Sequence, residues 1–105
     1  MNKVILLGNL TRDPEMRYTN SGTPVAEITI ANNRKVKEKE EVVFVDVTVW
    51  GKQAEILTEY FVKGSQILIE GRISQDSWED KETGKKRTKT FVTCDNFNFT
   101  GKKSE

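Results

Sequence analysis

Residues 42–50 read VVFVDVTVW, and their alternation decides how the chain is expected to fold. Side chains of a β-strand point to opposite faces in turn, so a period of two separates a core face from the face opposite. Valines occupy positions 43, 45, 47 and 49, and this shared face predicts a core contact. The opposite face carries Phe44 and Trp50, with Asp46 and Thr48 between them. The segment therefore predicts a strand that is valine on one face and partly aromatic on the other.

Further strands are expected at residues 4–7, 25–31, 66–74 and 90–99. Residues 4–7 are apolar at every position, which predicts a strand covered on both faces. In the fourth strand, Ile67, Ile69 and Ile73 are expected to point inward. Residues 34–41, RKVKEKEE, are expected to form a charged loop, in the simplest case the solvated tip of a hairpin. The sequence ETGK that ends at Lys85 predicts a second hairpin turn.

One helix is expected at residues 52–63, between the third and fourth strands. Its core-facing stripe would consist of Ala54, Leu57 and Phe61, flanked by Ile56 and Tyr60. The order β-β-β-α-β-β favours an all-β fold, a five-stranded OB-fold barrel with one helix, although other mixed β folds share that order. We expect one domain at residues 1–101 and a short polar tail at residues 102–105.

The composition argues against an enzyme. The chain has no histidine and a single cysteine, Cys94, so the usual general base, a zinc site of the N/S type and a disulfide framework are all missing. We therefore expect no catalytic residue, no metal and no cofactor, and we expect Cys94 to be a small buried residue. The apolar run at residues 4–7 is too short for a secretory signal or a membrane span, which predicts a cytoplasmic protein without a membrane partner.

Three aromatic residues are candidates for contact with nucleic acid. Phe44 and Trp50 are either buried against a neighbouring strand, subunit or helix, or form a stacking platform, because every base has a π-face. Strands two and three supply the binding face of an OB-fold. Trp78 has no apolar neighbours in sequence, which favours a binding or interface role over a place in the core.

One local cluster of charges is a candidate for contact with nucleic acid, whereas the net charge of the chain suggests none. The net charge is +1, from 17 basic and 16 acidic residues, so the bulk charge gives no support to nucleic-acid binding. The densest basic cluster is KKRTK, and its members Lys85, Lys86 and Arg87 either contact phosphates or belong to a solvated turn.

Several separate segments resemble the bacterial single-stranded DNA-binding proteins. They are NKVILLGNL at residues 2–10, DPEMRY at 13–18, SGTPVA at 21–26, WGKQAE at 50–55, YFVKGSQ at 60–66 and IEGR at 69–72, followed by Trp78. The resemblance runs over residues 2–99. It implies an OB-fold, usually a homotetramer, that coats single-stranded DNA without regard to sequence during replication, repair and recombination, in the cytoplasm with the nucleoid.

The resemblance also implies roles for particular residues. Phe44, Trp50 and Trp78 occupy the base-stacking positions of the family, and the basic positions expected to meet phosphate are Lys3, Lys52, Lys63 and Arg72. Two departures matter. Many relatives carry another aromatic residue before the third strand, where this chain has RKV at residues 34–36. Some relatives carry basic residues just before the later tryptophan, where this chain has Asp76 and Ser77, which implies a weaker phosphate contact.

The family usually ends in a long flexible tail whose acidic, hydrophobic tip recruits partner enzymes. This chain stops at Glu105, so it is either a truncated or a naturally short form, and the tail-mediated repair and replication partners are not expected of it. The alternative function is that of an OB-fold protein that assembles the primosome at replication restart. The aromatic pair on the third strand and Trp78 favour strand coating over that alternative.

Overall fold

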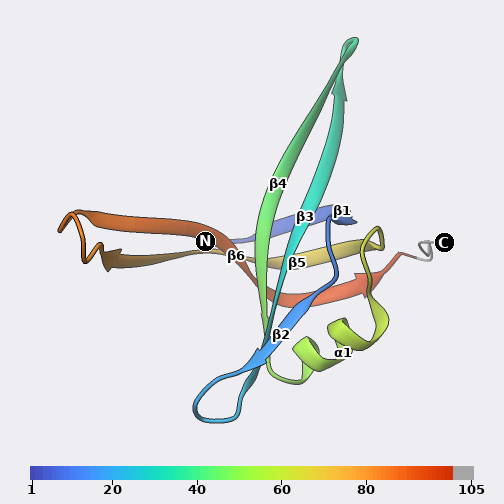
Figure 1. Ribbon diagram of the computed structural model, residues 1–105. Helices are drawn as coiled ribbons and strands as arrows, with labels where there is room; N and C mark the ends of the chain where they lie inside the picture. Colours follow the sequence, from blue (N-terminus) through green and yellow to red (C-terminus); the bar gives the residue numbers. More distant parts are fainter. Residues whose placement is uncertain (101–105) are drawn as a thin grey trace.

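The computed structural model describes residues 1–100, which form strands and one helix (Figure 1). The elements are β1 (Val4–Leu10), β2 (Glu15–Tyr18), β3 (Pro24–Val36), β4 (Lys39–Trp50), α1 (Lys52–Tyr60), β5 (Gln66–Glu79) and β6 (Lys86–Phe99). The polar tail expected at residues 102–105 lies outside the described residues. Within residues 1–100, no helix is both long and apolar enough to cross a membrane.

Five strands close into a barrel in the order β1-β5-β6-β4-β3, with β1 pairing to β3 to complete the circle. β4 and β6 pair in parallel, and the other pairs are antiparallel. β2 continues the edge of β1, because β1 pairs with β3 at Ala31 and Ile30 while β2 pairs with the stretch from Glu27 to Pro24. Pro14, which has no N–H to donate, lies in the break. β1 and β2 thus form one interrupted barrel strand, and the prediction of a five-stranded OB-fold with its helix between the third and fourth barrel strands is confirmed.

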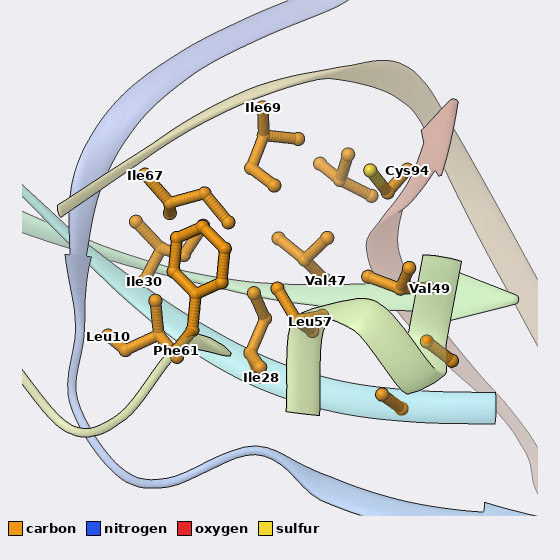
Figure 2. Close-up of a cluster of buried hydrophobic side chains, with 13 residues drawn as sticks. Leu10, Ile28, Ile30, Val47, Val49, Leu57, Phe61, Ile67, Ile69 and Cys94 are labelled. Carbon is orange, nitrogen blue, oxygen red and sulfur yellow. The ribbon is translucent and has the colours of Figure 1, made fainter. Parts of the chain in front are cut away.

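One apolar cluster fills the barrel (Figure 2). The ring of Phe61 is 1% exposed and lies among side chains from β1, β3, β5 and α1. The fully buried aliphatic members include Ile28, Ile30, Val47, Val49, Leu57, Ile67 and Ile69. Burial at this scale is the main source of stability, at roughly 25 cal/mol per Å² of apolar surface removed from water. Cys94 is buried in the same cluster, as predicted.

The helix covers the barrel with a narrower stripe than the sequence predicts. α1 packs against β3, β2 and β4, and Ala54, Leu57 and Phe61 are buried. Ile56 and Tyr60, expected beside that stripe, are instead 37% and 58% exposed. The helix also ends at Tyr60, three residues early. Phe61 adopts extended backbone, with φ −112° and ψ 143°, so that its ring reaches the core while its N–H donates to the carbonyl of Leu57 at 2.9 Å.

Two hairpins extend beyond the barrel in different directions (Figure 1). β3 and β4 stay paired as far as Val36 and Lys39, so most of the predicted charged loop at residues 34–41 is strand. Val43 and Ile73 were expected in the core, but each is 53% exposed because β4 and β5 carry them past the barrel wall. An alternating pattern assigns a side chain to a face, but that face is buried only where the barrel lies behind it.

The first strand also departs from its prediction. Ile5 is 64% exposed and Leu7 is 46% exposed, so β1 is not covered on both faces within this chain. Val4 and Leu6, which alternate with them, pack against the core cluster. Ile5 and Leu7, on the side of β1 that points away from the core, therefore form an exposed apolar row.

Candidate nucleic-acid interface

Four neighbouring strands present their outward side chains on one continuous surface, which we call the outer face. Thr48 of β4 is paired with Thr93 of β6, so the rows of the two hairpins lie side by side. The rows are Glu27, Thr29 and Ala31 on β3; Phe44, Asp46, Thr48 and Trp50 on β4; Arg87, Lys89, Phe91 and Thr93 on β6; and Arg72, Ser74, Asp76 and Trp78 on β5. The period of two that buries Val47 and Val49 directs the β4 row outward.

The three aromatic candidates are exposed. Phe44 is 65% exposed, Trp50 is 47% exposed and Trp78 is 50% exposed. This excludes the alternative that Phe44 and Trp50 are buried inside this chain. Phe44 and Trp50 lie in the β4 row, and Trp78 lies near the end of β5, on the arm formed by the second hairpin. The outer face therefore offers aromatic rings at three separate points, as a stacking surface requires.

Open hollows lie along this surface. One hollow of about 350 Å³ brings Trp50 and Arg72 together with Phe91. A second, of about 290 Å³, lies between Trp78 and Lys86 at the end of the second hairpin. A hollow of about 310 Å³ that Phe44 and Phe91 also line lies on the inner side of the sheet instead, because Val4, Leu6 and Val45, which pack against the core cluster, line it too. On the outer face, Phe91 therefore belongs to the hollow at Trp50.

Phe91 was not singled out from the sequence. It is half-buried on β6 and alternates with Val92 and Cys94, both of which are buried. That alternation was available in the sequence and places Phe91 on the outward side of the last strand. What the sequence did not reveal is that closure of the barrel brings this row beside the β4 row.

Some of the predicted basic residues join the outer face. Arg72 and Arg87 belong to its rows, and Arg87 is in register opposite Trp78. Lys86 lines the Trp78 hollow, and Lys85 lies in the turn that precedes it. Arg72 forms an ion pair with Asp95, which is the extra residue of a β-bulge on β6.

The remaining predicted cations lie outside those rows. Lys52 is the first residue of α1, two residues after Trp50. Lys3 precedes β1, and its Nζ lies 3.5 Å from Oε2 of Glu70. Lys63 lies in the turn after α1, where its backbone N–H donates to Oδ1 of Asp13 at 2.8 Å. The structure therefore does not gather all of the predicted basic residues at one place.

The described residues contain neither a reactive thiol nor a metal cluster. Cys94 is 6% exposed, and this burial raises the pKa of its thiol to about 11, with the nearby Asp95 charge adding to the effect. A raised pKa keeps the thiol protonated and unreactive near neutral pH. Across residues 1–100, no group of three or more His, Cys, Asp or Glu side chains is placed to hold a metal ion. The chemistry that the outer face does offer is aromatic stacking and charge.

Comparisons with known proteins agree with this architecture. The model of the single-strand binding protein family matches residues 1–100. A single-stranded DNA-binding protein of Wolinella succinogenes is 52% identical over 99 residues, which cover 90% of this chain and 60% of the relative. One of Helicobacter hepaticus is 48% identical over 99 residues, or 90% of this chain and 58% of the relative. Single-stranded DNA-binding protein 1 of Synechocystis is 39% identical over 106 residues, or 100% of this chain and 88% of the relative.

The chain spans about three-fifths of the length of the first two of these relatives. The match covers nearly all of this chain, and the residues that the family model matches are those that form the closed barrel and its helix. The chain therefore belongs to the single-strand binding protein family.

Proposed function

We propose that this chain binds single-stranded DNA along its outer face, without regard to sequence and without chemistry. The observation that carries the proposal is the hollow in which Trp50, Phe91 and Arg72 meet. Single-stranded DNA exposes its base faces together with its phosphates. An aromatic ring beside a cation can therefore stack on a base while the cation meets a phosphate. Stacking contributes roughly 1–3 kcal/mol per base and accepts any base, which makes the binding independent of sequence.

The strand would follow the rows of the outer face. Phe44, Trp50 and Trp78 would stack on bases, with Phe91 between the first two. Phosphates would meet Arg72 on the barrel and the cations of the second hairpin, Lys85, Lys86 and Arg87. Lys52 lies close enough in sequence to Trp50 to meet the phosphate of a base stacked there. Lys3 and Lys63 would meet only a strand that continues around the barrel.

In the cell, such binding would coat and protect single strands during replication, repair and recombination, in the cytoplasm with the nucleoid. We propose further that the chain acts as a homotetramer. Support comes from the exposed side chains Ile5 and Leu7 on β1, which lie beside Leu68 of β5. An apolar patch of this kind is typical of a surface that another copy covers.

Substitution of Trp50 tests the stacking role. Trp50→Ala should weaken binding of an oligo-dT by roughly 1–3 kcal/mol. The loss should be about equal at low and high salt, because no phosphate contact is removed. Folding stability should change little, since the ring is 47% exposed. Fluorescence anisotropy of a labelled oligonucleotide at two salt concentrations, together with thermal unfolding, measures both effects.

Tyr60→Ala provides a matched control, because Tyr60 is an exposed aromatic residue on α1, outside the outer face. It should leave binding unchanged. A folded Trp50→Ala protein that binds with the affinity of the unaltered chain would contradict the proposal, as would equal losses in the two variants.

A further inference from the structure

The cations around the centre of the outer face are already paired with carboxylates. Two adjoining hollows, one holding Asp46 and the other Trp50, are lined by four cations. Their ion-pair partners within 4.0 Å are Glu15 for Arg12, Glu27 for Arg17, Asp95 for Arg72 and Asp46 for Lys89. A phosphate that enters these hollows therefore meets cations that must leave or share a carboxylate.

Asp46 holds the central position among these carboxylates. It lies in the β4 row between Phe44 and Trp50. Its Oδ1 accepts a hydrogen bond from the hydroxyl of Thr29 at 2.8 Å, which fixes the side chain. Its Oδ2 lies 3.6 Å from Nζ of Lys89. Asp46 thus places a negative charge between two exposed rings and holds the nearest lysine.

Lys89 is well placed to change partners. It lies on β6 in register opposite Asp76, so two carboxylates face it. The side chains of Lys89 and Asp46 are 52% and 46% exposed. Exposed ion pairs of this kind contribute little to stability, so exchanging Asp46 for a phosphate costs the fold little.

We propose that Asp46 limits the affinity of the outer face for single strands by holding Lys89, which turns to a phosphate when a strand binds. This inference rests on the proposed function and specifies how the affinity is set. In the free protein, Asp46 takes the place of a counterion or a phosphate at Lys89. Binding at Lys89 therefore releases less counterion than binding at an unpaired lysine would.

Asp46→Asn tests the inference. The amide oxygen can still accept the Thr29 hydroxyl, while the charge that holds Lys89 is lost. The variant should bind oligo-dT more tightly than the unaltered chain at 50 mM salt. Its salt slope should be steeper by about 0.7, the contribution of one phosphate contact on a single strand, so the gain should shrink by a factor of about 2.6 between 50 and 200 mM salt.

Two further variants separate the release of Lys89 from a general effect of net charge. Glu59→Gln makes the same change in net charge at an exposed position of α1, outside the outer face, and should give no comparable gain. Asp46→Asn made in a Lys89→Met background should also give no gain. Unfolding curves of all variants would show that each is folded.

The outcomes separate the inference from the function on which it rests. If the unaltered chain binds oligo-dT but Asp46→Asn binds no more tightly, the inference is overturned and the proposed function stands. An equal gain from Glu59→Gln, or a gain that persists without Lys89, also overturns it. If no variant binds oligo-dT, the proposed function falls and the inference falls with it.

Discussion

Val49 and Trp50 are neighbours in sequence, yet Val49 is 0% exposed and Trp50 is 47% exposed. Alternation along the strand accounts for this contrast, and it was sufficient to predict that Phe44 and Trp50 share the side opposite the core. It was not sufficient for Val43, which has the parity of a core residue but lies where β4 has left the barrel. At the scale of the residue, parity can be predicted from the sequence, whereas burial depends on what lies behind the strand.

Cys94 yields a prediction at this scale. Its thiol would titrate near pH 9.0 in the unfolded chain, whereas burial raises its pKa to about 11 in the folded state. The folded state therefore favours the neutral thiol. The resulting contribution to the free energy of unfolding is fully present below pH 9.0 and is lost as the pH rises towards about 11.

Denaturant unfolding on both sides of that window measures the effect. Cys94→Ala is the reference, because every other group titrates in both proteins. The unaltered chain should lose more stability than Cys94→Ala as the pH rises. Equal losses would show that burial does not perturb the thiol.

At the scale of the element, the helix and five of the six strands within residues 1–100 were predicted from the sequence, but β2 (Glu15–Tyr18) and the length of the hairpins were not. Residues 34–41 contain no Gly, Pro, Asn or Asp to mark a turn and no apolar alternation to mark a strand. The turn is made by Lys37, with φ 58°, and Glu38, while backbone pairing carries the strands through the charged residues on both sides. By contrast, the turn of the second hairpin was predictable, because Gly84 supplies its positive φ of 70°.

β1 carries the prediction for assembly. It pairs with β5 from Val4 onward, but β3 joins it only at Asn9 and Leu10. No other strand within residues 1–100 pairs with the earlier part of its second edge. The same stretch exposes Ile5 and Leu7. An open strand edge beside an apolar row favours association with another copy. We expect sedimentation at micromolar concentration to show an oligomer, and we expect Ile5→Lys to shift it towards smaller species.

Ile5→Lys should leave the fold intact, because Ile5 is already 64% exposed. Val62→Lys is the matched control, since Val62 is 51% exposed in the turn after α1 and does not belong to the apolar row of Ile5 and Leu7. It should sediment like the unaltered chain. A monomer in the unaltered chain would contradict the proposed assembly.

At the scale of the whole molecule, barrel closure creates a surface that no single segment encodes. The rows of β4 and β6 are far apart in sequence and meet because Thr48 pairs with Thr93. This is why Phe91, and the Asp46–Lys89 pair that bridges the same two strands, were not singled out as site residues from the sequence. The composition of this surface also agrees with the net charge of +1, which offered no support for nucleic-acid binding. The cations are present on the outer face, but carboxylates accompany them.

The most direct test of strand binding uses the chain's two tryptophans, which both lie on the outer face and are about half exposed. Their fluorescence should be quenched to saturation when the protein is titrated with oligo-dT, because the bases of a single strand are free to stack on the rings. A duplex of the same length keeps its base faces stacked on one another, so it should bind far more weakly. Equal affinity for the duplex and the single strand would contradict the account.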